Sequence, residues 1–307
     1  MSRMADPSIV FPVRNPSSPR GLAMMFRNSA KTAVLLAALG GVMVGIGSLF
    51  GRGGAIIGLV IGVAVVGFSY WGSAKLAIRS ARAVVADEAQ FPQYYAIMRE
   101  LTAKANLPMP DLFISPDAQP NAFATGRNPQ HAAVAITVGL TQVCSWDEIR
   151  GVLAHELAHI RNRDILIGSV AAAVAMSISF IANMAMWGAM FSGGRDEDDR
   201  RTNPIALLAT ALLAPIAASL IQMAISRSRE FAADRSGADL AGSGEPLARA
   251  LQKLDAYSKA VPMNIAPAQA SHFIVNPLAG GHAKFANLFR THPPTEQRVA
   301  RLIGSDV

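Results

Sequence analysis

The segment His155-Glu156-Leu157-Ala158-His159 has the residue types and the spacing to bind a divalent metal ion. Residues at positions i and i+4 share one face of a helix, so both imidazoles can reach a single ion. Glu156 can reach a water on that ion and take its proton. The pattern therefore indicates metal-assisted hydrolysis, and the alternative is a helix face with two solvated histidines.

A catalytic zinc ion needs a third protein ligand and an open coordination position. Residues 229–234 offer two carboxylates, Glu230 and Asp234, one helical turn apart. We expect Glu230 to bind the metal. We expect Asp234 to accept a hydrogen bond from the distal nitrogen of a ligand histidine, which fixes the tautomer of that ring. The alternatives are a surface ion pair of Glu230 with Arg227 or Arg229 and a solvated Asp234.

Short regular elements surround the motif. Helical spacing of apolar residues predicts a helix over residues 87–106, and β-branched runs predict strands over 111–115 and 132–138. Ser145 and Glu148 form a capping-box pattern, in which each side chain satisfies a free backbone amide at a helix start. The motif helix should therefore run from Trp146 to about Arg161.

Four charge-free apolar stretches cover residues 32–51, 53–74, 165–194 and 202–226. Each reaches the roughly 20 residues that a membrane-spanning helix needs. The composition agrees, because 51% of the 307 residues are hydrophobic and only 16% are charged, against about 25% charged in soluble domains. Buried core helices are the alternative, mainly for the last two, alanine-rich stretches.

The charge of the chain excludes several other classes of protein. The net charge of +7 comes from dispersed Lys and Arg, and only 7% of residues are aromatic, so we expect no nucleic-acid partner. The single cysteine, Cys144, excludes a disulfide framework. Ionisable groups inside the spans, which a transporter or channel would need, are absent from all four stretches.

The basic residues predict the orientation. Lys and Arg flank the first pair of stretches on both sides, which favours the cytoplasm for both flanks. Two stretches separate His159 from Glu230, and an even number of crossings returns the chain to the same side. Both termini and the metal site should therefore be cytoplasmic, in contact with a lipid bilayer that the chain crosses several times.

These observations divide the chain into five segments. They are a Pro- and Ser-rich disordered preface (1–24) without the layout of a signal peptide, a transmembrane hairpin (25–80), a first cytoplasmic segment with the motif helix (81–164), a second membrane hairpin (165–226) and a second cytoplasmic segment with the third ligand (227–307).

Four segments together resemble HtpX-type membrane zinc metalloproteases, relatives of the CAAX prenyl protease: residues 155–164, 228–234, 119–126 with 133–137, and 291–298. The resemblance spans about residues 25–303. It implies a mostly α fold, with integral membrane helices and a cytoplasmic zincin-like α+β metalloprotease domain. It also implies one zinc ion per chain, the inner membrane of a bacterium, and polypeptide substrates, mainly misfolded or damaged membrane proteins, in quality control under stress.

Two further roles complete the expected mechanism. The tetrahedral oxyanion needs a donor besides zinc, and we expect His292, with Arg298 as the second candidate; the alternative for His292 is a turn residue before Pro293. An extended substrate should pair with an edge strand, formed by residues 121–126 or 134–138, and the alternative is an internal strand of the sheet. A processing protease of the prenyl-protease type and an inactive zinc-binding scaffold stay open as rival functions.

Overall fold

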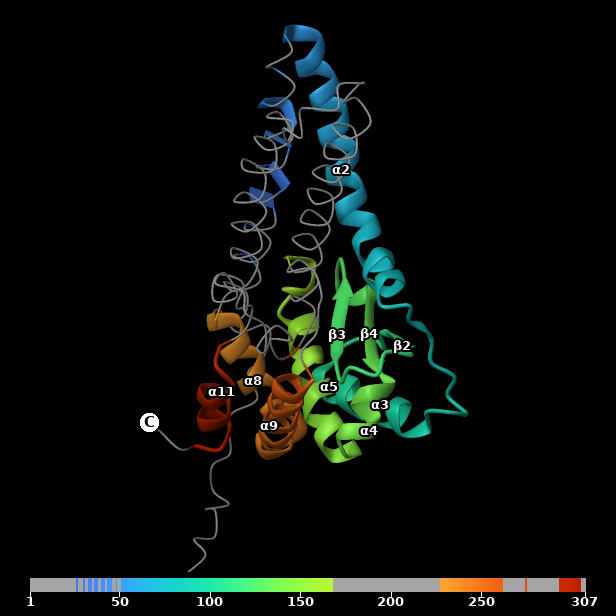
Figure 1. Cartoon of the computed structure of the whole chain (residues 1–307), viewed down its shortest axis with the longest axis vertical. Helices are drawn as coiled ribbons and strands as arrows, with labels where there is room; N and C mark the ends of the chain where they lie inside the picture. Colours follow the sequence, from blue (N-terminus) through green and yellow to red (C-terminus); the bar gives the residue numbers. More distant parts are fainter. Residues whose placement is uncertain are drawn as a thin grey trace, which may run out of the picture.

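The computed structural model describes residues 51–167, 227–261 and 293–304, together with Ile274 and single positions between 26 and 48. The predicted disordered preface, most of the predicted second hairpin and His292 lie outside these residues. The described part of the chain is mostly helical with one small mixed sheet (Figure 1).

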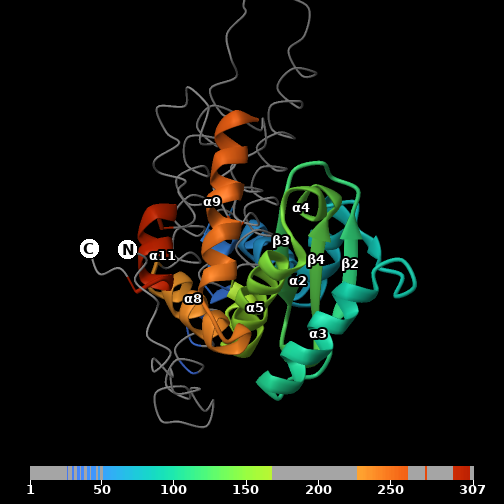
Figure 2. The same cartoon turned by 90° about the horizontal axis from the view of Figure 1, so that it is seen from below.

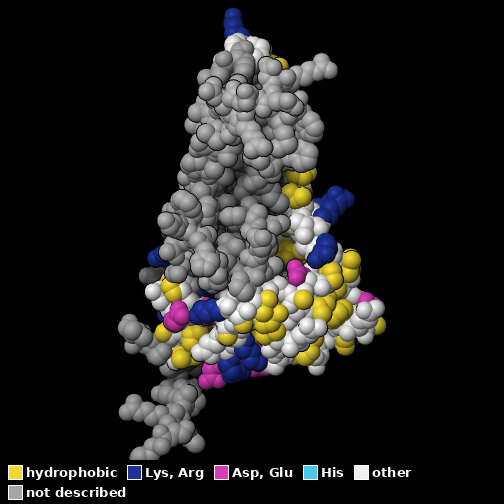
Figure 3. All heavy atoms as spheres, viewed as in Figure 1, with side chains coloured by type: hydrophobic (Ala, Val, Ile, Leu, Met, Phe, Trp, Pro, Cys, Tyr) yellow, Lys and Arg dark blue, Asp and Glu magenta, His cyan; other side chains and the backbone are white. Residues whose placement is uncertain are grey.

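A single long helix, α2 (Gly51–Ser80), leads from the far tip of the molecule down to the sheet (Figure 1). Its first 18 residues, Gly51–Phe68, have a mean hydropathy of 1.9, and their side chains mostly point outward. Within the described residues, α2 is the one helix long and apolar enough to cross a membrane. Lys and Arg side chains lie near both ends of this helix (Figure 3), where Arg52, Lys75 and Arg79 are exposed.

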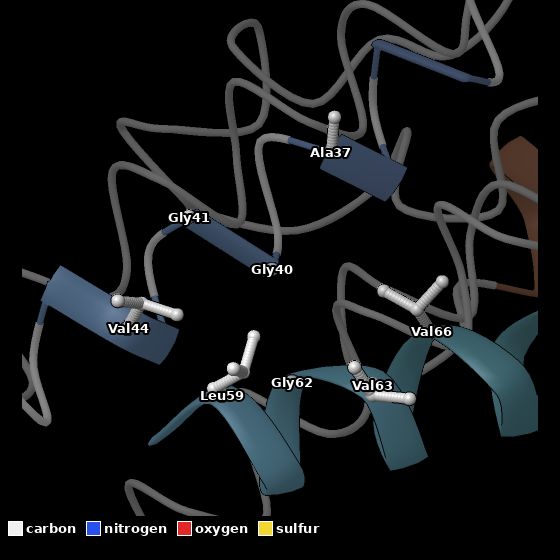
Figure 4. A pocket seen from close by; sticks show the side chains of 8 residues that line it. All are labelled: Ala37, Gly40, Gly41, Val44, Leu59, Gly62, Val63 and Val66. Carbon is white, nitrogen blue, oxygen red and sulfur yellow. The ribbon is translucent and has the colours of Figure 1, made fainter. Parts of the chain in front are cut away.

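One strip of α2 does pack against protein. Gly62 is buried, and its backbone approaches Gly40 and Met43 of the preceding apolar stretch so closely that an added Cβ would lie 3.3 Å from the Met43 Cβ. Figure 4 shows the crevice beside this contact. It encloses about 310 Å³ and is lined by small and aliphatic residues from both segments: Ala37, Gly40, Gly41, Val44, Leu59, Gly62, Val63 and Val66.

The sheet has the order β1-β2-β4-β3. Its strands are β1 (Val84–Val85), β2 (Asp111–Ser115), β3 (Ala122–Gly126) and β4 (Ala132–Thr137). The β2–β4 pair is parallel and the other two pairs are antiparallel. Of the two segments considered as the edge strand, β3 lies at the edge. The alternative, residues 134–138, is wrong because β4 is paired on both sides and Val138 already begins helix α4 (Val138–Val143).

Helices cover both faces of the sheet. Alternate side chains of each strand point to opposite faces, so each face has apolar side chains to bury. On one face, Phe123 and Ala135 pack against Ala77 in the last turns of α2. On the other, Val134 and Ile136 join a core with helices α3 (Pro92–Ala105) and α5 (Trp146–Arg161). Figures 1 and 2 show this layering.

The predicted helix over residues 87–106 begins five residues later than expected. Asp87 instead forms a turn, in which its carbonyl accepts hydrogen bonds from the amides of Gln90 and Phe91. Pro92 disfavours helical geometry at the residue before it and fits the first turn of a helix, so α3 starts there. Asn106, in left-handed geometry with φ 52°, ends the helix.

Two more helices, α8 (Arg227–Ala241) and α9 (Glu245–Ala260), pack beside α5, and α11 (Thr295–Leu302) packs against α8 and α9. α5 has the predicted bounds, and both halves of the Ser145–Glu148 capping box are present. Apolar side chains of α5, α8 and α9 share the main core with the sheet and α3. The motif helix is therefore held on several sides before any metal binds.

Candidate metal centre

The two helices that carry the predicted ligands touch along their backbones. At Gly237 in α8, an added Cβ would lie 2.8 Å from the backbone nitrogen of His155 in α5. Gly151 provides the same closeness one turn earlier in α5, where an added Cβ would lie 2.5 Å from the backbone of Leu247 in α9. Glycine at these positions lets α8 and α9 approach α5 without a clash, and this brings Glu230 over the motif.

The structure brings His155, His159 and Glu230 together. The Nε2 atoms of the two histidines are 3.1 Å apart. The Glu230 carboxylate lies 3.7 Å from each of them, through Oε2 to His155 and Oε1 to His159. One donor atom of each residue falls within 4.8 Å of the others. The predicted third ligand therefore lies beside the histidine pair, although 70 residues separate it from His159 in the sequence.

The spacing of the three donors fits a zinc ion. Tetrahedral zinc with bonds of about 2.0–2.1 Å separates its ligand atoms by about 3.4 Å, which lies between the observed 3.1 and 3.7 Å. Two imidazole nitrogens and one carboxylate are also a donor set typical of catalytic zinc, with a fourth position open for water.

Each histidine has a carboxylate at its distal nitrogen. Nδ1 of His155 lies 3.0 Å from Oδ1 of Asp234, the residue predicted for this position. Nδ1 of His159 lies 3.1 Å from Oδ2 of Asp164. A carboxylate at Nδ1 favours the tautomer that leaves Nε2 unprotonated and able to bind a metal.

Asp164 is a site residue that the sequence reasoning missed. It follows the end of α5, where Arg163 adopts a positive φ of 57° and the amide of Asp164 donates to the carbonyl of His159. This turn folds the chain back onto the helix, so that the carboxylate reaches the ring five positions earlier. The available signal was an acidic residue just past the helix end and before a charge-free run.

The charged groups around the metal centre shift the pKa values of His159 and Asp234. Burial alone would lower the pKa of His159, but the negative charges of Asp164, Glu230 and Glu156 outweigh it and raise the pKa to about 10. Burial would raise the pKa of Asp234, yet Arg298 and His155 hold it at about 2. The carboxylates therefore favour a positive charge at this centre, as a cation site requires.

Arg298 in α11 has 1% of its surface exposed and lies beside Asp234 and His155. Its Nε and Nη2 donate to the two oxygens of Asp234 at 2.9 and 2.7 Å, and its Nη1 donates to the carbonyl of Ile274 at 3.0 Å. Nη2 also lies 3.5 Å from Nε2 of His155. These contacts make Arg298 a support for Asp234, while an oxyanion role for Arg298 stays a prediction.

Glu156, the predicted general base, faces the edge strand. Oε2 of Glu156 accepts a hydrogen bond of 2.8 Å from the backbone amide of Ala124 in β3. The amide of Thr137 in β4 donates to the carbonyl of Asn121, which precedes β3. Along an antiparallel strand, the backbone groups of successive residues alternately face the partner strand and point away from it. The backbone groups of Ala122, Ala124 and Gly126 therefore point away from β4, toward the metal centre.

Among the other histidines, His131 is exposed, and its Nδ1 lies 2.9 Å from Oδ1 of Asn128. His272 and His282 lie outside the described residues, as does His292.

Comparison with known proteins gives a consistent result. Residues 88–305 match the model of peptidase family M48. Proteins named Protease HtpX homolog from Burkholderia mallei (strain SAVP1) and Burkholderia pseudomallei (strain K96243) are each 52% identical to the chain over 280 residues, which is 90% of this chain and 96% of theirs. The crystal structure of S. mikatae Ste24p aligns with a TM-score of 0.47 and 17% identity, over 92% of this chain and 66% of that one, just under two thirds.

The family match includes α5, α8 and α11, and hence every residue of the metal centre described above. It confirms the resemblance to HtpX-type proteases and the expectation of a metal-dependent hydrolase. The chain belongs to peptidase family M48.

Proposed function

We propose that the chain is a membrane-anchored zinc endopeptidase that cleaves polypeptides on the cytoplasmic side of a bacterial inner membrane. The observation that carries the proposal is the placement of His155, His159 and Glu230 at tetrahedral spacing next to the carboxylate of Glu156. His155, His159 and Glu230 would hold one zinc ion per chain, and a bound zinc ion would supply a water with its pKa lowered toward about 7 and a Lewis acid for the scissile carbonyl.

The residues of the chain carry the proton transfers. Glu156 takes the proton of the attacking water and passes it to the leaving amine. The amide of Ala124 orients the Glu156 carboxylate through its 2.8 Å hydrogen bond. Asp234 and Asp164 hold the two imidazoles in the metal-binding tautomer. His292 is the proposed oxyanion donor, with Arg298 as the second candidate.

The edge strand β3 is the proposed binding site for the substrate backbone. An extended peptide that adds to this edge gains main-chain hydrogen bonds, and these depend little on sequence. Such binding suits an enzyme that acts on many unfolded segments, and it supports misfolded or damaged membrane proteins as the substrates. A dedicated processing protease would need side-chain pockets as well.

The membrane part of the proposal rests on α2 and its flanks. Gly51–Phe68 is long and apolar enough to span, and the positive charges of Lys75, Arg79 and Arg82 support a cytoplasmic location for the lower end of the helix. We extend this to the five segments of the chain: a preface (1–24), a hairpin (25–80), a protease segment (81–164), a second hairpin (165–226) and a second protease segment (227–307).

The activity is tested with the purified full chain in detergent. We expect about one zinc per chain, cleavage of unfolded casein, and loss of cleavage with a chelator that added zinc reverses. Glu156→Gln should keep the zinc and lose cleavage. Equal cleavage by this variant and the parent would contradict the role of Glu156, and zinc without any cleavage would favour the inactive scaffold.

The topology is tested by thiol labelling in intact cells. In a Cys144→Ser background, a cysteine at position 194 should react with a membrane-impermeant reagent, because the second hairpin would expose its loop outside. Labelling only after lysis would place that loop in the cytoplasm. Reporter fusions at residues 85 and 307 should be active on the cytoplasmic side alone.

A further inference from the structure

The lower part of α2 extends beyond the apolar window that can span a membrane. The window ends at Phe68, but the helix continues to Ser80. Trp71, 67% exposed, follows the window and packs edge-on against Tyr70 with ring centroids 5.0 Å apart. An exposed tryptophan followed by a lysine, here Lys75, is typical of the membrane–water interface.

This extension is fixed to the protease domain at its lower end. Ala77 is buried in one cluster with Phe123 and Ala135. One turn later, the carbonyl of Ala81 accepts a 2.6 Å hydrogen bond from the hydroxyl of Ser115 in β2. Because the helix is continuous and packs on two strands, it sets the position of the sheet relative to the interface.

The same contact leads directly to the proposed base. Phe123, which packs on α2, is followed in β3 by Ala124, whose amide donates to Glu156. The residue that packs on α2 and the residue that binds Glu156 are therefore neighbours in one strand. This arrangement leaves little room for the site to move toward or away from the membrane.

The length of this part of α2 sets the distance between the membrane interface and the sheet. The helix rises about 14 Å from Phe68 to Ala77, and about 9 Å from Trp71 to Ala77, at 1.5 Å per residue. A headgroup layer of about 5–8 Å fits within this rise. An extended peptide advances about 3.3 Å per residue, so three to four residues are needed to cover it.

We propose that α2 holds the metal centre at a fixed distance from the bilayer and so selects membrane-protein bonds that lie about four or more residues beyond the end of the substrate's own transmembrane segment. Bonds closer to the membrane cannot reach β3 unless the substrate segment is pulled out of the bilayer. This inference rests on the proposed function and adds a geometric limit to the substrates.

The test uses the unaltered full chain in vesicles of phosphatidylethanolamine and phosphatidylglycerol. Each substrate has one transmembrane helix, a Gly/Ser spacer of one, two, four, eight or sixteen residues, a short casein peptide with a single bond that the enzyme cleaves in solution, and a folded reporter. Cleavage should fall at least tenfold for spacers shorter than about four residues, because a linker that cannot span two sites contributes almost no effective concentration.

Two controls separate the possible causes of a failure. The same casein segment without a membrane helix should be cleaved, and if it is not, the proposed function and this inference both fail. Replacing Gly/Ser by helical Glu-Ala-Ala-Ala-Lys repeats should move the threshold to about nine residues, because a helix rises only about 1.5 Å per residue. Equal cleavage at spacers of one and sixteen residues would overturn the fixed distance.

Discussion

Along residues 51–68 of α2 the large apolar side chains point outward, whereas around His155 the charged side chains are buried. Val60 is 64% exposed and Val63 is 65% exposed. In the metal centre, Asp234 and Arg298 are 3% and 1% exposed. One chain thus contains a helix whose apolar side chains are exposed and a site whose charged side chains are buried.

Different surroundings explain the two arrangements. In water, exposed apolar area of this size on a helix is unfavourable by about 25 cal/mol per Å², so the surface of α2 is stable only against lipid or other protein. A buried charge is tolerated only when it is paired or binds a metal. At the metal centre the Asp234–Arg298 pair and the cation site meet that condition. Each region is therefore sensitive to the substitutions that the other would tolerate.

The largest effect should come from removing the charge that the buried site needs most. Glu230→Ala leaves two imidazoles without the carboxylate, and zinc affinity should fall by more than the 10–100-fold that supporting residues contribute. Competition with a chelating dye measures it. Glu245→Ala, which removes an exposed carboxylate at the start of α9, is the matched control and should bind zinc normally. Full occupancy of Glu230→Ala at limiting zinc would move the third ligand elsewhere.

Adding a charge to α2 should have the next largest effect. Val60→Arg places a guanidinium near the middle of the apolar window, which is unfavourable by about 2.5–3.5 kcal/mol in a membrane. Val84→Arg is the control, because Val84 of β1 is almost equally exposed, at 61%, but lies on the protease domain. The Val84→Arg substitution should change the free energy of unfolding by no more than about 0.5 kcal/mol.

The readout for this pair is the position of α2 itself. In a Cys144→Ser background, Arg52→Cys should be labelled from outside intact cells. Adding Val60→Arg should reduce that labelling, and adding Val84→Arg should not. If both arginines leave the labelling unchanged, α2 is not embedded in lipid.

The two supporting carboxylates should have a smaller effect than Glu230. Asp234→Asn and Asp164→Asn each remove the negative charge at one Nδ1, and zinc affinity should fall about 10–100-fold in either variant. Metal titration under the same conditions compares them. An unchanged affinity in Asp164→Asn would show that the turn at Arg163 only ends the helix, and that His159 needs no partner.

The difference between Asp234 and Asp164 also shows what the sequence could predict. Asp234 was expected because it lies one helical turn from Glu230, and helical periodicity can be read from spacing alone. The same holds for α5, whose start follows from the capping box of Ser145 and Glu148. Asp164 depends on a left-handed residue after the helix, and no residue type requires that conformation at Arg163.

Long-range contacts explain the other differences. Gly237 is essential to the approach of α8 to α5, but in the sequence it is only a glycine inside a helix, because its neighbour His155 is distant in the chain. The pairing of β4 on both sides could not be inferred from its own residues, which suit an edge or a central strand equally. Arg298 was proposed for its charge, and its pairing with Asp234 was visible only in the fold.

The smallest effect concerns the strip of α2 that is packed like a protein core. Gly62→Ala would place a Cβ 3.3 Å from that of Met43, so the two segments must separate slightly, against a gain of about 1 kcal/mol in helix propensity. At Gly67, the added Cβ would make only ordinary contact with Trp71, at 3.5 Å, so Gly67→Ala should keep the whole gain.

We expect Gly67→Ala to raise the free energy of unfolding in mixed micelles, and Gly62→Ala to lower it by less than about 1 kcal/mol. Equal shifts would mean that the crevice in Figure 4 closes without strain, and that α2 contacts its neighbour no more closely than it contacts lipid.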